Sequence, residues 1–234
     1  MDTAELLGYF GLTRQESALY RMLCSEGRMT GYEAAKATGI SRSNTYTALA
    51  GLVEKGAALI EEDTATHYLP VPAEEFCGNR IRRMQEYAQR LTRVLPEKRE
   101  EAEGYITVKG EENIFDRMKN MIDEAKERVY LAVSEKTLSK LMPQIEAAVA
   151  RGLKVVIITD PPFSLDGAQV YHTKTRQYQV RLIADSKNVL TGDTASGSES
   201  TCLYSKKRNL IELFKEALKN EITLITMMEG SGLF

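Results

Sequence analysis

The fold of the N-terminal third is decided by residues 30–46, which read TGYEAAKATGISRSNTY. Thr30 and Glu33 are spaced as a capping box, in which the threonine side chain accepts from a first-turn N–H and the glutamate reaches back. Gly39 permits a tight bend after this short helix, and Ser41 is a good N-cap for the helix that follows. A short helix, a glycine turn and a second helix form the pattern of a helix-turn-helix.

The flanking residues extend this pattern to a winged helix-turn-helix domain over residues 1–71. A second capping box, at Thr13 and Glu16, opens a preceding helix. After Gly56, two short apolar segments around a polar tip predict a β-hairpin, which in this position is a wing. The helix after Ser41 carries side chains that can read base edges or hold phosphates. The predicted DNA contacts are Arg42, Ser43, Asn44, Thr45, Tyr46 and Lys55.

The charge of this region argues against contacts from the wing. Residues 1–70 hold six basic and nine acidic side chains, and the wing tip is the acidic run Glu61-Glu62-Asp63. No acid lies between Ser41 and Val53, so this helix can approach a polyanion. Because non-specific DNA binding is electrostatic, we expect it to be modest. Because acidic side chains outnumber basic ones here, the alternative that the winged helix binds another protein and not DNA also stays open.

A connecting helix is predicted after Pro72, whose fixed φ suits a first helical position. Its apolar residues fall at heptad spacing: Cys77, Ile81, Met84, Ala88, Leu91 and Leu95. Pro96 limits the clean helix to about 23 residues, or about 35 Å. We therefore predict a dimerisation helix within residues 72–103. An amphipathic helix packed on its own domain is the alternative. A dimer would read two half-sites about one DNA turn apart, which is a palindromic operator.

The rest of the chain, residues 104–234, alternates between strand and helix patterns. This alternation predicts an α/β sandwich, and the whole chain is then a multidomain α/β protein. The predicted strands are residues 105–108, 129–133, 155–158, 180–184, 188–190, 201–204 and 222–227. The predicted helices are residues 114–125, 138–150 and 210–218.

Composition bounds the class of protein. The 234 residues are 43% hydrophobic and 27% charged with a net charge of −2, which are ordinary globular values. The cysteines, Cys24, Cys77 and Cys202, lack C-x-x-C spacing, so neither a disulfide framework nor a metal site is expected. There is no signal peptide pattern and no apolar run of about 18 residues. We therefore expect a cytoplasmic protein without a cofactor.

These motifs resemble those of TrmB-type regulators, which are archaeal and bacterial sugar-responsive transcription factors. In the first half the similar segments are residues 11–20, 34–46 and 52–56. In the second half residues 108–110, 148–155, 204–206 and 210–214 are similar to their phospholipase-D-like domain. The founding members have a further C-terminal sugar-binding domain that this sequence does not show. The resemblance therefore implies a DNA-binding regulator, but it does not by itself imply sugar sensing.

The sequence lacks the catalytic motif of phospholipase-D-like enzymes, H-x-K-x4-D, in which histidine is the nucleophile, lysine holds phosphate and aspartate orients the histidine. His172 and Lys174 match its start, but Gln179 stands at the acid position. Counting back from Asp185 instead places Val180 at the lysine position and Tyr178 at the histidine position. We therefore expect no enzyme.

A phospholipase-D-like fold that lacks the catalytic motif suggests a domain for dimerisation or effector sensing. The residues predicted to bind a small polar effector, such as a sugar, are Tyr171, His172, Tyr178, Asp185 and Tyr204. The function predicted is a homodimeric, sequence-specific transcriptional regulator controlled by such an effector. Two alternatives stay open: a phosphodiesterase or nuclease with a winged-helix targeting domain, and a winged-helix protein-interaction module.

Overall fold

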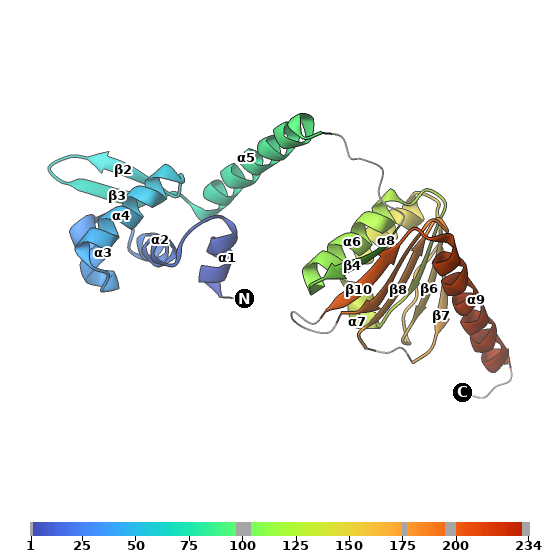
Figure 1. Cartoon of the computed structure of the whole chain (residues 1–234). Coiled ribbons are helices and arrows are strands. Elements are labelled where there is room, and N and C mark those ends of the chain that lie inside the picture. Colours follow the sequence, from blue (N-terminus) through green and yellow to red (C-terminus); the bar gives the residue numbers. More distant parts are fainter. Residues whose placement is uncertain (1, 97–103, 175–176, 195–199, 231–234) are drawn as a thin grey trace. The chain divides into compact units, whose positions relative to one another are not determined.

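The computed structural model describes residues 2–96, 104–174, 177–194 and 200–230, and the chain divides into two compact units, residues 1–98 and 99–234 (Figure 1). The end of the predicted connecting segment, residues 97–103, lies outside the described residues. The elements of the first unit are α1 (Thr3–Tyr9), α2 (Arg14–Glu26), β1 (Met29–Thr30), α3 (Gly31–Thr38), α4 (Arg42–Glu54), β2 (Ala58–Glu62), β3 (Thr66–Pro70) and α5 (Ala73–Val94).

The caps predicted from the sequence start the helices of the first unit. The hydroxyl of Thr13 accepts from the N–H of Glu16, and that of Thr30 accepts from the N–H of Glu33, both at 3.3 Å. Both capping boxes are complete. Gly39 ends α3 with φ at +70°, a left-handed conformation that side chains disfavour. This local chemistry confirms the helix-turn-helix of α3 and α4.

The wing is a β-hairpin of β2 and β3, to which β1 pairs on the other side of β3. The sequence predicted the hairpin but missed α1 and the two-residue strand β1. Below the wing lies a closed core in which Leu19, Leu23, Leu49 and Leu52 have no exposed surface. The wing and the three helices α2, α3 and α4 therefore form one packed domain (Figure 1).

The first turn of α5 belongs to this core. Phe76 is 1% exposed, and its ring centroid lies 5.7 Å from that of Tyr20 and 6.2 Å from that of Phe10. Cys77 is half-buried against the same cluster. Every residue of α5 from Ile81 onward is exposed. The helix is thus anchored at its start and leaves the domain beyond it.

The second unit is built on one mixed sheet of seven strands in the order β4-β10-β9-β8-β5-β6-β7. Strands β5, β6 and β7 are parallel to one another, and the other neighbours are antiparallel. Its elements are β4 (Tyr105–Lys109), α6 (Glu111–Glu124), β5 (Arg128–Ala132), α7 (Glu135–Ser139), α8 (Met142–Ala150), β6 (Lys154–Thr159), β7 (Ala168–His172), β8 (Gln179–Ala184), β9 (Asn188–Asp193), β10 (Thr201–Ser205) and α9 (Arg208–Gly230).

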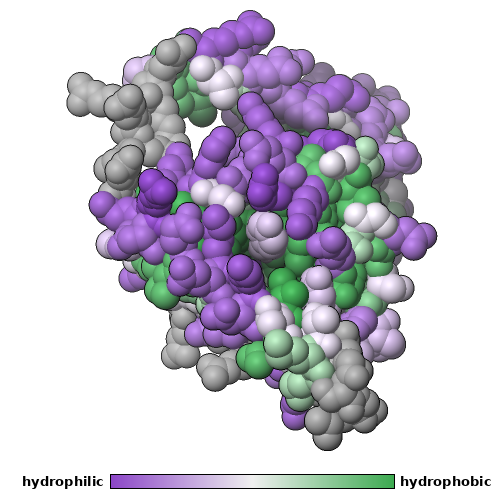
Figure 2. Space-filling view, turned by 90° about the vertical axis from the view of Figure 1, so that its right-hand side faces the viewer, coloured by the Kyte–Doolittle hydropathy of each residue, from purple (hydrophilic) through white to green (hydrophobic). Residues whose placement is uncertain are grey.

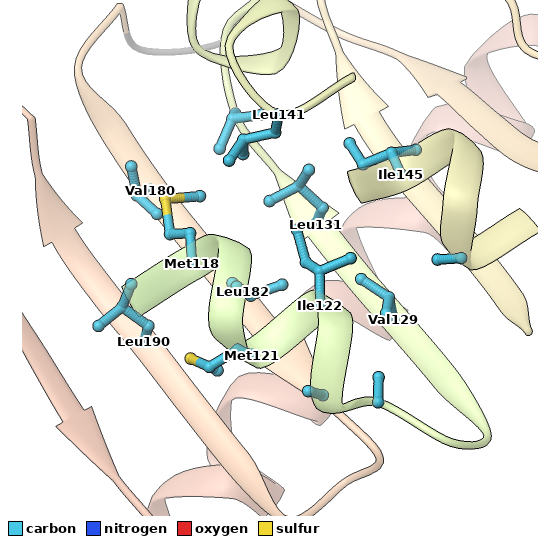
Figure 3. Close-up of a cluster of buried hydrophobic side chains, with 14 of the residues drawn as sticks. Met118, Met121, Ile122, Val129, Leu131, Leu141, Ile145, Val180, Leu182 and Leu190 are labelled. Atoms are coloured by element: carbon cyan, nitrogen blue, oxygen red, sulfur yellow. The ribbon is translucent and has the colours of Figure 1, made fainter. Parts of the chain in front are cut away.

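The two faces of this sheet are covered unequally. Helices α6 and α8 lie on one face and α9 lies on the other (Figure 1). On the first face, side chains of α6 such as Met118 and Ile122 interlock with Leu131 and Leu182 of the strands (Figure 3). On the second face a smaller cluster, including Ile158 and Ile183, packs under the single helix α9. This arrangement confirms the predicted α/β sandwich.

Three features of the second unit differ from the sequence-based prediction. Residues 222–227, predicted as a strand, continue α9, because Leu218, Ile222 and Ile225 fall at helical spacing and pack on the sheet. The predicted helix 138–150 is two helices, α7 and α8. Strand β7 was not predicted, because its alternation of apolar and polar residues is weak.

Candidate DNA interface and effector site

The first turns of α4 form an exposed polar surface. Ser41 caps the helix by accepting from the N–H of Asn44, and the side chains of Arg42, Ser43, Asn44 and Tyr46 are exposed. Thr47, which the sequence analysis did not select, is exposed beside them. These side chains can contact bases or phosphates without any rearrangement of the core.

Aromatic rings from α3 and α4 support this surface. The guanidinium carbon of Arg42 lies 4.6 Å from the centroid of the Tyr32 ring, which is a cation–π contact. The ring of Tyr46 lies against Gly31, where a β-carbon would collide with it. Tyr32 was not predicted as a site residue, although its position at the start of α3 faces the start of α4. The stacking holds Arg42 in an ordered position on this surface.

Thr45 does not belong to this surface. Its side chain has no exposed area, and its hydroxyl donates to the carbonyl oxygens of Ile40 at 3.3 Å and Ser41 at 3.1 Å. Thr45 lies three and four positions before the buried Ala48 and Leu49, and so shares the face of α4 that packs on the core. The prediction that Thr45 contacts DNA is therefore not supported by its position.

Lys55, the last predicted contact, is committed to the fold. Its ammonium lies 2.6 and 2.8 Å from the carboxylate oxygens of Glu16, which is buried. Burial acts to raise the pKa of Glu16, but hydrogen bonds from Lys55 and Thr13 hold that pKa below its ordinary value. Gly51 faces this carboxylate, and a β-carbon there would collide with it. The pair therefore joins α2 to the end of α4, and the charge of Lys55 is balanced by that of Glu16.

The wing keeps its acidic tip. Glu61, Glu62 and Asp63 are exposed, and Glu61 forms an ion pair with Arg28. That ion pair lowers the net negative charge at one of the three positions only. The wing tip is therefore acidic and exposed, whereas the exposed part of α4 from Arg42 to Val53 holds no acid.

Helix α5 carries an exposed apolar stripe. Among the six residues predicted for a dimer seam, Ile81, Met84, Ala88 and Leu91 are helical and exposed, and we call these four the α5 stripe. Ile81 is 49% exposed and Leu91 54%, values that are high for aliphatic side chains. The other two differ, since Cys77 packs on the core of its own unit and Leu95 follows the helix in extended backbone. Tyr87 and Val94, which the heptad pattern missed, widen the exposed apolar surface.

The five residues predicted to bind the effector do not line one common cleft. Tyr204 on β10 packs into the core under α6, where Arg117 stacks over its ring at 3.8 Å and its hydroxyl donates to Asn188. Tyr171 on β7 packs on the opposite face of the sheet, under α9. A single ligand therefore cannot touch both tyrosines.

Asp185 has a structural role at the turn between β8 and β9. Its carboxylate accepts the backbone N–H groups of Lys126 at 2.9 Å, Glu127 at 2.8 Å and Arg128 at 3.0 Å. Burial acts to raise the pKa of Asp185, but these three hydrogen bonds hold it below its ordinary value. The residue adopts φ of +52°, which suits a short polar side chain in a tight turn. Its oxygens are thus used to fix the start of β5.

The remaining candidates lie apart from Asp185. Tyr178 precedes β8 and is exposed, whereas Asp185 follows the same strand, so the two stand at its opposite ends. The Nε2 atom of His172 lies 2.7 Å from the carbonyl oxygen of Phe163. Val180, at the position of the motif's lysine, is fully buried. Tyr178, Val180 and Asp185 therefore do not come together as a phosphodiesterase centre.

Within the part of the chain that the structure describes, no three His, Cys, Asp or Glu side chains gather as metal ligands do. Cys24, Cys77 and Cys202 are free thiols, and burial raises the pKa of Cys202 to about 12. Cys24 is exposed, Cys77 is half-buried and Cys202 is buried. Among the helices that the structure describes, none has the length and apolar character needed to cross a membrane.

Family models match both units. Residues 6–74 match the model described as Sugar-specific transcriptional regulator TrmB. Residues 104–220 match the model described as Transcriptional regulator TrmB, EBD N-terminal subdomain. The chain therefore belongs to the TrmB family of transcriptional regulators. This membership confirms the predicted DNA-binding transcriptional regulator.

Two individual proteins are similar to this chain. The uncharacterized protein YrhO of Bacillus subtilis (strain 168) is 25% identical over 96% of this chain and 86% of its own length. The HTH-type sugar sensing transcriptional regulator TrmBL1 of Pyrococcus furiosus is 31% identical over 62% of this chain, which spans 44% of that protein.

Two solved structures are similar to a lower degree. TrmBL2, an archaeal chromatin protein, is 22% identical over 94% of this chain and 96% of its own, with a TM-score of 0.44. Nuc of Salmonella typhimurium, a phospholipase D family member, is 18% identical over 50% of this chain and 92% of its own, with a TM-score of 0.40.

Proposed function

We propose that this regulator binds a palindromic operator as a homodimer, reads bases with α4, and is controlled by a small effector bound to its second unit. The observation that carries the proposal is the exposed start of α4, where Arg42 and Asn44 lie free of the core. Arginine matches guanine and asparagine matches adenine in the major groove. The absence of acids from Arg42 to Val53 lets this helix approach phosphates.

The experiment that tests DNA binding is selection of bound fragments from random DNA by the full chain. A sequence-specific dimer recovers an inverted repeat whose half-sites lie about one helical turn apart. Recovery of a single half-site would contradict the dimer but not the reading helix. Failure to recover any sequence at low salt would contradict DNA reading and favour the protein-interaction alternative.

Support for the dimer comes from the α5 stripe. Its apolar side chains recur at heptad spacing along a helix that its own unit leaves exposed. A second copy of the same helix can cover such a stripe with identical side chains. The stripe contains only four side chains, so we expect the second unit to add to the dimer contact.

Charging the stripe is expected to separate the protomers. In the double variant Ile81→Glu with Leu91→Glu, like charges would meet in an apolar contact. Each lost apolar side chain accounts for about 1.5–3 kcal/mol of association. Light scattering measures the result. The control, Arg90→Gln with Arg93→Gln, changes the net charge equally on the opposite side of α5. A stripe variant that stays as dimeric as the control would place the interface elsewhere.

We further propose that the second unit binds ligand without turning it over and that the protein acts in the cytoplasm, where bacterial and archaeal DNA lies. The buried Val180 and the committed carboxylate of Asp185 support the absence of phosphodiesterase chemistry. Assay of the full chain with a generic phosphodiester tests it. Turnover that disappears in His172→Ala would contradict the proposal.

A further inference from the structure

A cavity of about 500 Å³ lies between α9 and the sheet of the second unit. It lies on the face opposite α6, where α9 alone covers the strands. Figure 2 looks onto the side that carries α9 and shows hydrophobic surface exposed among hydrophilic side chains. The volume of the cavity is within the range of sites for small organic ligands, which is about 300–1,000 Å³.

The floor of this cavity is one straight row across four strands. Ile183 of β8 pairs with Tyr130 of β5, Tyr130 pairs with Val156 of β6, and Val156 pairs with Gln169 of β7. Residues in register on neighbouring strands present their side chains next to one another on the same face. The register of the sheet therefore places two aliphatic side chains, a phenol and an amide in a continuous row.

The walls follow from the same periodicities. Lys154 and Tyr171 each lie two residues along their strand from a floor residue, and so share its face. From α9, Lys215, Leu218 and Ile222 project into the cavity at helical spacing.

Helix α9 is fixed in place above this row. The guanidinium of Arg181 binds the carboxylate of Glu221 at 2.5 and 3.0 Å, and both side chains are half-buried. Ile211, Leu218 and Ile225 are buried against the sheet. The cavity is therefore bounded by a helix held through several contacts along its length.

The charges at the rim favour an anion. Glu212 and Lys215 form an ion pair at 3.4 Å, which leaves Lys154, Lys219 and Glu216 at the rim. Neither Lys154 nor Lys219 has an ion-pair partner among the residues that the structure describes. The rim as a whole carries one positive charge in excess, above a floor of two aliphatic side chains, a phenol and an amide.

We propose that this cavity binds a small organic anion with an apolar ring face, and that Lys154 and Lys219 hold the anionic group. The ring face lies on Val156 and Ile183 between the phenol rings of Tyr130 and Tyr171, and Gln169 hydrogen-bonds a polar substituent. A sugar phosphate and an aromatic carboxylate both have this chemistry. Only the role of the ligand as an effector rests on the proposed function.

Isothermal titration of the full chain tests the site with four probes: glucose 6-phosphate, salicylate, glucose and inorganic phosphate. We expect one organic anion to bind with one site per chain, and glucose and phosphate to bind more weakly. The double variant Lys154→Ala with Lys219→Ala is expected to weaken that binding about tenfold or more, since a hydrogen bond to a charged group contributes at least this factor. The control, Lys119→Ala with Lys126→Ala, removes equal charge outside the cavity and is expected to bind as the unchanged chain does.

Three results would overturn the site: neither organic anion binds at millimolar concentration, the double variant binds as tightly as its control, or phosphate alone binds as tightly as the organic anion. Operator affinity is measured on the same samples. Anion binding without operator binding would contradict the proposed function and leave the site standing. Operator binding without anion binding would do the reverse.

Discussion

The start of α4 and the turn after β8 both carry polar side chains of the kinds that perform chemistry, yet they use them differently. At α4, Arg42 and Asn44 extend from a capped helix into solvent. At the β8–β9 turn, both carboxylate oxygens of Asp185 accept hydrogen bonds from backbone N–H groups. A polar side chain is available to a partner only when the fold does not already use its hydrogen bonds. The turn therefore has a structural role, and the exposed start of α4 is the surface that we propose for recognition.

The largest expected effect concerns Lys55, which the comparison assigns to the fold. Lys55→Met removes the cation that the structure places beside the buried carboxylate of Glu16, which we expect to lower the free energy of unfolding by about 3 kcal/mol. Chemical denaturation measures it. The exposed Lys36→Met is the control and is expected to change stability by less than about 0.5 kcal/mol. Unchanged stability together with weaker DNA binding would return Lys55 to the interface.

The next effect concerns Asp185. Asp185→Ala strands three backbone N–H groups at the start of β5, and we expect it to lower the free energy of unfolding by about 2 kcal/mol. Asp185→Asn keeps an acceptor oxygen and tolerates the positive φ, so its loss is expected to be smaller. Denaturation of both variants measures the difference. An Asp185→Ala variant as stable as the unchanged chain would contradict the structural role of Asp185 at this turn.

The same carboxylate predicts a pH dependence. Because the pKa of Asp185 is lowered in the folded state, its contribution to stability is present above the unfolded pKa of about 3.9. The contribution is lost as the pH falls through the lowered folded value. The stability difference between the unchanged chain and Asp185→Ala is therefore expected to shrink below about pH 4. A difference that stays constant through that range would contradict the role of the charge.

The smallest effect concerns Thr45, next to Asn44. Thr45→Val removes the hydroxyl that donates to the carbonyls of Ile40 and Ser41, and is expected to lower the free energy of unfolding by about 1 kcal/mol. Affinity for the operator is expected to stay unchanged, because the side chain is buried. Thr47→Val, on the exposed side of α4, serves as the control for stability. Loss of affinity in Thr45→Val without loss of stability would contradict the assignment of this residue to the core.

Local patterns predicted the first unit well. The capping boxes at Thr13 and Thr30 and the turn at Gly39 depend on residues within four positions of one another, so the sequence reveals them directly. The heptad pattern likewise predicted the α5 stripe. It could not show that Cys77 belongs to the core, because that depends on where Phe76 is buried.

Long-range contacts explain what the sequence could not predict. Lys55 meets Glu16 across 39 residues, and Asp185 meets Glu127 across 58. The strand predicted at residues 222–227 rests on β-branched residues, whose preference is overridden when Ile222 and Ile225 pack on the sheet as part of α9. The floor of the α9 cavity depends on the register of four strands, which no spacing along the chain encodes.

The central claim is that α4 reads DNA, and operator affinity measured beside folding stability tests it most directly. For Arg42→Ala and for Asn44→Ala, we predict a loss of about 1–3 kcal/mol in affinity for the selected operator. Their affinity for unrelated DNA is expected to change less, and their free energies of unfolding to stay close to that of the unchanged chain. Operator affinity that is unchanged in both variants would contradict the claim.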